Sequence, residues 1–402
     1  MSETVPEGWV RGNFEKLSAV RKTKYQPQTN SVEFAYVGLE HLGSSSRKIK
    51  EFGSSADIVS TKTKFWKGDT LFGKLRPYLR KVAYPDCDGV CSTDILALSP
   101  TRSTDPVFLF YTCASDKFIA NAVESSAGNV MPRASWDDLA CLQIQIPPLI
   151  EQKKIASILT SVDEVIENTQ RQIDKLQELK KATMNELLTK GIGHTEFKDS
   201  ELGRIPKSWE VKRLDEISVI SRGKFSHRPR NDPNFYNGIF PYLQTGDIPV
   251  DVTDITSYTQ TLNEQGLSVS KLFPSGTLVL TIAATIGEVG VLTFDSCFPD
   301  SLVGITCDQD KIGKYFLLYS LRHAKEKLIA EAPESAQKNL NLDILNPFTI
   351  KVPSLREQGE IETTLLSLDQ NLMGKTQKLA QMQSLKKSLM QDLLTGKVRV
   401  QV

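Results

Sequence analysis

The sequence predicts a mixed α/β (α+β) fold, in which two similar domains are separated by two long antiparallel coiled-coil helices in a pseudo-twofold tandem repeat. Three observations lead to this prediction. One long segment occurs twice, each copy carries a heptad-like apolar seam, and the remaining sequence alternates short apolar runs with turn residues.

The repeated segment is the clearest feature of the chain. Residues 146–191 reappear without a gap as residues 352–397, and Glu151 and Glu357 lie at equivalent positions 206 residues apart. The repeat extends into the remaining sequence, because Pro6–Trp9 is echoed by Pro206–Trp209. We therefore expect a first domain over residues 1–148, a first helix over 149–190, a second domain over 191–352 and a second helix over 353–397.

Both helical segments carry apolar residues that alternate by four and three positions, which is the spacing of a left-handed coiled coil. The first seam contains Ile155, Leu159, Val162, Ile166, Ile173 and Leu176, and the second contains Ile361, Leu365, Leu368, Leu372, Leu379 and Met382. Each is interrupted at the equivalent position, by Thr169 and by Lys375, which either fixes the register or lies at a tolerant edge. The ends of a compact domain usually lie close together, so the helices on either side of the second domain are expected to be antiparallel.

The domain interiors contain short apolar or alternating runs bounded by turn residues. Examples are Phe34–Leu39, Asp94–Leu98 and Leu278–Ile282. Such runs are typical of mixed sheets with a few helices. Trp9 and Trp209 lie beside turn prolines at matching positions, which favours a place in the domain core over a base-stacking role.

Composition indicates a soluble globular protein, because 402 residues with 40% hydrophobic and 24% charged content are enough for two or three packed domains. The first residues, MSETVPEGWV, lack the features of a signal peptide, so the cytoplasm is the expected location. Six cysteines are scattered, and Cys87 and Cys91 have no partner cluster of His or Cys. We expect reduced thiols and no metal site.

Net charge is only +1, but basic residues are concentrated at the start of each half. Residues 9–81 contain 15 Lys or Arg against 6 Asp or Glu, and residues 204–230 contain 8 against 3. Basic clusters at matched places in two repeats fit contacts with nucleic-acid phosphates. An ordinary solvated surface explains the charge equally well.

No catalytic motif is found in the sequence. Residues 68–75 (GDTLFGKL) imitate a phosphate-binding loop, but Leu75 stands where a Ser or Thr hydroxyl would hold magnesium. The four histidines are far apart in sequence, and none belongs to a zinc-protease or nucleophile signature. We therefore predict no catalytic, cofactor-binding or metal-binding residue in this chain.

The Pro-Leu and Glu-Gln boundary before each helix, the Leu-Leu-Thr-Gly type ending, and the phrases YVGLEHL at Tyr36 and YLQTGDI at Tyr242 resemble the specificity subunit of type I restriction-modification enzymes. The resemblance covers essentially the whole chain. It implies a non-catalytic subunit whose two target recognition domains each read one half of an asymmetric, bipartite double-stranded DNA sequence.

The resemblance also implies that the helices set the spacing and bind two adenine methyltransferase subunits, with motor-nuclease subunits completing the enzyme. S-adenosylmethionine, ATP and Mg²⁺ are then expected on the partner subunits. Apolar residues outside the seam, such as Ile158, Val165 and Leu187, are expected near the docking sites. The alternative is a coiled-coil scaffold or adaptor without sequence-specific DNA binding.

Polar and basic residues in the matched basic regions and in two loops near the domain ends are the candidate DNA contacts. They are Arg21, Lys22, Lys24, Arg47, Lys48, Lys74, Arg76, Asn129 and Arg133 in the first domain, and Arg222, Lys224, His227, Arg228, Arg230, Gln244, Thr245, Gln337, Lys338 and Asn339 in the second. Base contacts would provide specificity, and phosphate contacts would position the domains.

Overall fold

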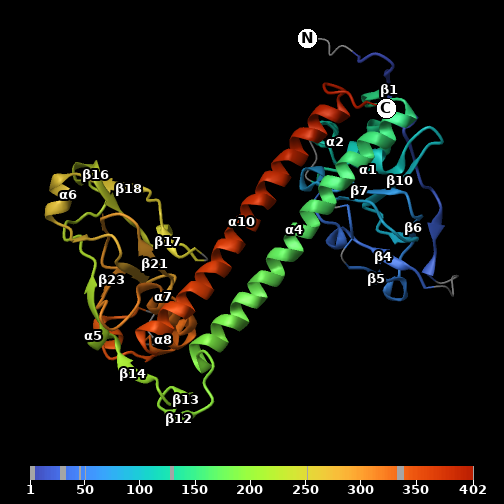
Figure 1. Cartoon of the computed structure of the whole chain (residues 1–402). Helices are drawn as coiled ribbons and strands as arrows, with labels where there is room; N and C mark the ends of the chain where they lie inside the picture. The colour runs from blue at the N-terminus through green and yellow to red at the C-terminus, as the bar shows by residue number, and fades with distance from the viewer. Residues whose placement is uncertain are drawn as a thin grey trace. The chain divides into compact units, whose positions relative to one another are not determined.

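The computed structural model describes residues 5–27, 33–44, 47–49, 51–126, 131–250, 252–332 and 339–401. The chain divides into two compact units, the first containing Met1–Gln170 with Lys378–Val402 and the second Arg171–Gln377. Two long helices, α4 (Leu149–Lys190) and α10 (Leu355–Leu394), each contribute one part to each unit (Figure 1).

The first unit contains three sheets, with strand orders β1-β11, β2-β10-β7-β8 and β3-β6-β9-β4-β5. The strands are β1 (Val10–Asn13), β2 (Ser18–Val20), β3 (Lys24–Tyr25), β4 (Ala35–Val37), β5 (Gly53–Ser54), β6 (Lys62–Phe65), β7 (Thr70–Gly73), β8 (Val82–Ala83), β9 (Gly89–Cys91), β10 (Ile95–Pro100) and β11 (Gln143–Ile146). The short helices are α1 (Pro106–Ala114), α2 (Asp116–Ser125) and α3 (Trp136–Ala140).

The second unit contains four sheets, with strand orders β12-β13, β14-β24, β15-β23-β20-β21-β17 and β18-β16-β22-β19. The strands are β12 (Phe197–Ser200), β13 (Gly203–Pro206), β14 (Glu210–Arg213), β15 (Ser218–Arg222), β16 (Tyr236–Tyr242), β17 (Asp254–Ile255), β18 (Gln260–Leu262), β19 (Leu272–Phe273), β20 (Leu278–Thr281), β21 (Val289–Leu292), β22 (Ser296–Cys297), β23 (Leu302–Cys307) and β24 (Thr349–Val352). The short helices are α5 (Leu214–Ile217), α6 (Glu264–Ser268), α7 (Lys314–His323), α8 (Lys325–Glu331) and α9 (Leu342–Leu345).

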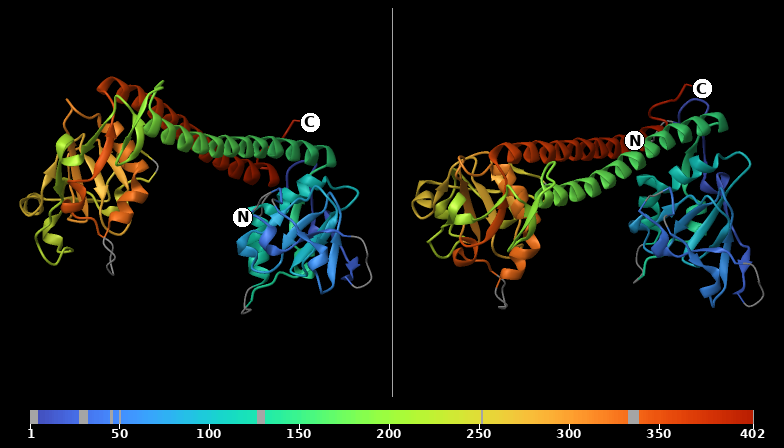
Figure 2. Two further views of the ribbon diagram at one scale, coloured as in Figure 1. Left: turned by 90° about the horizontal axis from the view of Figure 1, so that it is seen from below. Right: turned by 60° about the horizontal axis from the view of Figure 1, so that its bottom comes forward.

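The core of each unit includes residues from the long helices as well as from the domain. In the first unit, Ile155 and Leu159 of α4 and Leu393 of α10 belong to the same buried cluster as Phe108 and Phe118. The seam residues Ile361 and Leu365 and residue Leu188 occupy the corresponding cluster of the second unit. The helical segments of each unit lie along one side of its sheets (Figure 2), so the predicted seam packs partly against the domains.

Largely buried ion pairs fix how the helices pair within each unit. In the first unit, Lys386 Nζ lies 2.7 Å from Asp163 Oδ1, which also leaves the second carboxylate oxygen to accept a 2.7 Å hydrogen bond from Tyr111. Residues later in α10 pack with residues earlier in α4, so the two segments are antiparallel.

The second unit repeats this arrangement with the roles of the helices exchanged. Lys180 of α4 pairs with Asp369 of α10, and Tyr319 donates a 2.6 Å hydrogen bond to the same carboxylate. Burial, followed by the neighbouring carboxylate, raises the pKa of both Tyr111 and Tyr319, so both hydroxyls remain protonated donors at neutral pH. The predicted fold class, including the antiparallel helices and the tandem repeat, is confirmed.

The repeated glutamate in the first turn of each long helix binds a tryptophan. Glu151 accepts a 2.9 Å hydrogen bond from Trp9 Nε1 and a bidentate pair from Arg399, and the end of the chain lies beside β1 (Figure 1). Glu357 accepts 3.0 Å hydrogen bonds from Trp209 Nε1 and from the backbone N–H of Ile192, just after α4, and lies 2.8 Å from His194 Nε2. Both tryptophans are buried, as expected for domain-core residues.

The seam interruptions differ in environment. Thr169 is buried, and its hydroxyl donates a 2.7 Å hydrogen bond to the carbonyl of Val165 on the same helix. Lys375 is partly exposed. Across the described residues, neither long helix nor any shorter one has an apolar stretch of the length that a bilayer crossing requires.

Candidate nucleic-acid interface

In the first unit, backbone hydrogen bonds bring three polar segments together at the end of β7. The Lys74 N–H donates to the Asp94 carbonyl over 2.9 Å, and the Ala134 N–H donates to the Lys74 carbonyl over 2.9 Å. The Arg76 N–H donates to the Pro132 carbonyl over 2.8 Å, and Leu75 forms a bridge with Arg133. Residues 74–76 and 132–134 therefore form one fixed edge.

The turn that joins β7 to β8 contains a 3-10 helix over Pro77–Leu79, capped at both ends by left-handed arginines. Arg76 has φ 52° and Arg80 has φ 55°. A left-handed backbone costs a residue with a Cβ roughly 1–2 kcal/mol, so this turn stores strain at two positions.

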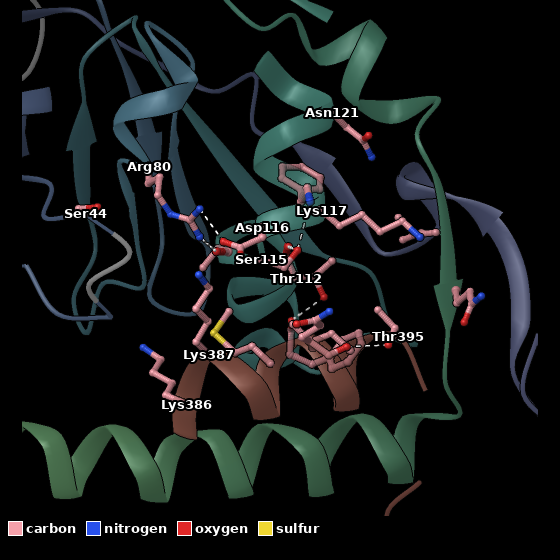
Figure 3. Close-up of a pocket in the computed structure, with 18 of the residues that line it drawn as sticks. Ser44, Arg80, Thr112, Ser115, Asp116, Lys117, Asn121, Lys386, Lys387 and Thr395 are labelled. Carbon is pink, nitrogen blue, oxygen red and sulfur yellow. Dashed lines mark hydrogen bonds and ion pairs between the residues drawn. The ribbon is translucent and has the colours of Figure 1, made fainter. Parts of the chain in front are cut away.

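The two arginines are used differently. The Arg80 guanidinium turns inward, where Nη1 lies 2.7 Å from Asp116 and Nη2 donates to the Ala114 carbonyl over 2.9 Å. Figure 3 shows Arg80 directed toward Asp116 in the wall of a cavity of about 620 Å³, with Lys386 and Lys387 on the opposite side. Arg76 is exposed, and no partner of its side chain is found among the described residues. Arg80 is thus structural, and Arg76 is available to a ligand.

Arg133 lies next to this turn and is half exposed. Its Nε is 3.2 Å from Asp94 Oδ1, so the carboxylate orients the guanidinium without covering it. Together with Lys74 and Arg76 it forms what we call the first polar edge. Among the described residues, these three cations have one acidic neighbour in contact, Asp94, which suits binding of a phosphate backbone or a base edge.

The other candidates of the first unit lie outside this edge. Arg21 forms a salt bridge of 2.9 Å with the buried Asp69 and lies over the Trp66 ring, whereas Lys22 and Lys24 are exposed. Arg47 donates to Thr160 of α4 over 3.1 Å, and Lys48 pairs with Glu167 of α4. Asn129 lies outside the described residues.

The second unit repeats the edge at the end of β20. The Ile282 N–H donates to the Ser301 carbonyl over 3.1 Å, and the Leu340 N–H donates to the Ile282 carbonyl over 3.0 Å. Ala283 forms a bridge with Asn339, equivalent to the bridge between Leu75 and Arg133 in the first unit. We call residues 282–285 with Ser301 and Asn339 the second polar edge.

Three predicted arginines of the second unit meet at Asp300, which precedes Ser301. Arg230 Nη2 lies 2.5 Å from Asp300 Oδ1, Arg228 Nη2 lies 3.9 Å from Oδ2, and Arg222 Nε donates to the Asp300 carbonyl over 2.6 Å. Asp300 therefore gathers guanidinium groups from two segments: the two loop arginines lie at its carboxylate, and Arg222 of β15 lies at its backbone carbonyl. All three arginines remain exposed.

A cavity of about 390 Å³ lies beside these arginines, lined by Arg230, Asn231, Tyr236, Tyr242, Gln244, Gln260, Pro299 and Ser301. Gln244 donates to Gln260 over 3.0 Å, and the Thr245 hydroxyl lies 3.4 Å from that of Ser301. Burial raises the pKa of both tyrosines, so their hydroxyls are uncharged at neutral pH. The structure thus connects Arg230, Gln244 and Thr245 with the second polar edge.

The remaining candidates of the second unit are peripheral. His227 is 3.2 Å from Asp232 and packs against Phe235, and Lys224 is exposed with its carbonyl accepting from Ser270. Gln337 and Lys338 lie outside the described residues.

Several site residues were missed by sequence reasoning. Asp94 and Ser301 occupy equivalent places just before β10 and β23, and Asp300 and Gln260 orient predicted residues. The repeat offered a signal for Asp94 and Ser301, since each directly precedes a matched buried strand. Asp300 gave none, because it lies outside the basic regions and is 70 positions away in sequence from Arg230, which it contacts.

Comparison with known proteins decides the family of this chain. The family model described as "Type I restriction modification DNA specificity domain" matches residues 20–178 and 206–383. The chain belongs to this family of type I restriction-modification DNA specificity proteins. The two matched segments correspond to the two repeats. The first contains the first polar edge, and the second contains the second polar edge.

A curated relative agrees with this assignment, and two solved structures share the fold. The MjaVIII type I restriction enzyme specificity subunit of Methanocaldococcus jannaschii is 30% identical over 331 residues, which cover 78% of this chain and 75% of the relative. A chain from a type I restriction-modification system studied for complex assembly and conformational transition has TM-score 0.62 at 22% identity, covering 98% and 100% of the two chains. The type I specificity subunit of M. genitalium has TM-score 0.61 at 15% identity, covering 98% and 97%.

Because the chain contains two copies of the specificity domain, it carries two similar polar edges, one in each copy. Groups of three or more His, Cys, Asp or Glu side chains arranged for a metal ion are not found in the part of the chain that the structure describes. The two polar edges are the places where exposed cations, amides and hydroxyls converge.

Proposed function

We propose that the chain is the sequence-reading subunit of a type I restriction-modification complex, with the first domain reading one half of a bipartite DNA target and the second domain the other half. The observation that carries this proposal is the recurrence of an exposed polar edge at the same place in both units. The edges differ in chemistry, so the two half-sites need not be alike. The long helices would then set the distance between the half-sites.

We further propose that this subunit performs no chemistry itself and functions in the cytoplasm. Adenine methyltransferase subunits would bind S-adenosylmethionine, and motor-nuclease subunits would bind ATP and Mg²⁺. The family membership supports this division of labour. The candidate DNA contacts named from the sequence remain part of the proposal, with Lys74, Arg76, Arg133, Arg230, Gln244, Thr245 and Asn339 as those that the polar edges favour.

Repeated apolar side chains on the helices suggest where two copies of one partner dock. Leu385 in the first unit is 43% exposed, and Leu179 in the second is 50% exposed, and the two positions are equivalent in the repeat. Leu149 and Leu355, at the helix starts, form a second exposed and equivalent pair. Val165 is also exposed, but Ile158 and Leu187 instead pack against the domain cores. Two equivalent apolar positions fit two identical methyltransferase subunits.

Sequencing of modified bases in host DNA tests the proposed recognition. We expect a bipartite methyladenine motif that disappears when the gene is deleted. A hybrid in which residues 206–350 come from another family member is expected to change one half of that motif and leave the other intact. A methylome that is the same with and without the gene contradicts the proposal, and a change in both halves contradicts independent reading.

Docking is tested with Leu179→Glu and Leu385→Glu. Each substitution places a charge in an apolar contact, so each single variant is expected to retain one methyltransferase copy and the double variant none, as counted by native mass spectrometry of the co-purified complex. Gln177→Glu, an exposed change on the same helix, is the matched control and should retain two copies. A double variant that carries two copies would exclude these leucines as docking points.

A further inference from the structure

The two polar edges share one unusual backbone feature. Arg76 in the first unit and Ala284 in the second both have left-handed backbones, with φ 52° and φ 62°. Each is the second residue after the one whose N–H and carbonyl anchor the edge, Lys74 and Ile282 respectively. The same strained position therefore recurs in both domains.

Glycine would adopt this conformation without strain, yet both positions carry an exposed side chain. Each edge is held on both sides: in the first unit by β10 and residue 133, and in the second unit by β23 and residue 339. The left-handed backbone therefore projects the Cβ of residue 76 or 284 from a rigid edge. Strained residues with a Cβ are typical of ligand-binding positions. The structure thus presents residues 76 and 284 in equivalent ways.

The chemistry of the two positions differs sharply. Arg76 is exposed, has no side-chain partner in the part of the chain that the structure describes, and is accompanied by Lys74 and Arg133. Ala284 is instead followed by the exposed Thr285, and its neighbour Ala283 forms a bridge with Asn339. An arginine pairs bidentately with O6 and N7 of guanine. Alanine and threonine methyl groups contact the thymine methyl group, and asparagine pairs with adenine on its N6 and N7 edge.

We propose that residues 76 and 284 are equivalent base-reading positions, so that Arg76 selects a guanine in the half-site of the first domain and Ala284, with Thr285 and Asn339, selects an A·T pair in the half-site of the second. This inference rests on the proposed function, and it adds which base class each domain reads through its turn. Arg80, which shares the turn with Arg76, has no such role because Asp116 and Ala114 bind its guanidinium.

The test uses Arg76→Gly and Ala284→Gly in the full-length chain, expressed in the host with its partner subunits. Glycine relieves the left-handed strain, so both variants should melt at or above the wild-type temperature. With melting preserved, a changed motif reports the lost side chain and not misfolding. Arg102→Gly, which removes an exposed arginine elsewhere in the first unit, is the control for lost charge. Sequencing of methylated bases reports every base of the motif.

In the wild type we expect a required G·C pair in one half of the motif and a required A·T pair in the other. Arg76→Gly should reduce the preference at that G·C pair by roughly ten-fold or more and leave the other half unchanged. Ala284→Gly should weaken the preference for the A·T pair, and Ala284→Arg should shift the preference at that position toward guanine. The Arg102 variant should leave the motif intact.

Each negative result has its own meaning. If the wild type yields a bipartite motif and Arg76→Gly and Ala284→Gly retain every base requirement, the base-reading assignment is wrong while the proposed function stands. If the wild type yields no motif that depends on the gene, the proposed function fails and the assignment fails with it. If Arg76→Gly weakens methylation equally at all sequences, Arg76 contacts a phosphate and the assignment is overturned.

Discussion

Lys386→Met is expected to destabilise the protein by about 3–5 kcal/mol, because it leaves the Asp163 carboxylate buried without a counter-ion. The side chains of Lys386 and Asp163 are 18% and 9% exposed, so solvent screens this pair weakly. Lys180→Met is expected to have the same effect in the second unit, where the side chains of Lys180 and Asp369 are 16% and 11% exposed. Thermal melting should show the unfolding of the affected unit lowered by roughly 6–20 °C.

Each of these lysines has an exposed lysine next to it, which provides a matched control. Lys387→Met and Lys181→Met make the same chemical change one position along the helix and should shift melting by less than about 0.5 kcal/mol. Combining Lys386→Met with Asp163→Asn removes the unpaired charge and should recover part of the loss. Equal melting of Lys386→Met and Lys387→Met would show that the ion pair does not hold the helices together.

The repeated features of this chain could be predicted from sequence because the duplication acts as an internal comparison. The repeat aligns Asp163 with Asp369, and in the structure each aspartate pairs with one tyrosine and one lysine, although the sequence alone did not predict those partners. The apolar seam predicted the helices, since a spacing of four and three residues follows directly from helix geometry. The repeat and the apolar spacing were therefore sufficient to predict the two helices and their correspondence.

Side-chain partners that are distant in sequence could not be predicted. Arg47 and Lys48 looked identical to Lys74 and Arg76 as parts of a basic region, yet α4 binds the first two through Thr160 and Glu167. Arg21 likewise has the buried Asp69 as its partner. Charge composition does not reveal which cations are already paired, because pairing depends on how the strands and helices pack.

The polar edges were predicted only in part. The sequence singled out Arg76, Arg133 and Asn339, but not the backbone bridges that place residue 133 beside 75 and residue 339 beside 283. Ala284 could not have been chosen from sequence, because an alanine carries no chemical signal. Its significance arises from a left-handed φ at the place where the other domain has an arginine.

The second large effect is expected at the glutamine that follows the repeated glutamate. Gln152 is 1% exposed, and its amide accepts a hydrogen bond from the Asp105 N–H over 2.9 Å and donates to the carbonyls of Pro147 and Ser103. Gln358 repeats this pattern with the Gly313 N–H and the carbonyls of Pro353 and Lys311. Asp105 and Gly313 are the N-caps of α1 and α7, so each glutamine ties the start of a long helix to the start of a domain helix.

Gln152→Leu and Gln358→Leu fill the same space but leave the buried carbonyl of Pro147 or Pro353 and the partly buried N–H of Asp105 or Gly313 without partners, so each should cost about 2–4 kcal/mol. Gln177→Leu, at an exposed position of α4, is the matched control and should be nearly neutral. Hydrogen exchange should show faster opening of α1 in the first variant and of α7 in the second, because the lost bonds anchor those helix starts. Unchanged exchange at α1 and α7, together with melting equal to that of the control, would mean that packing of the apolar seam alone fixes the domains to the helices.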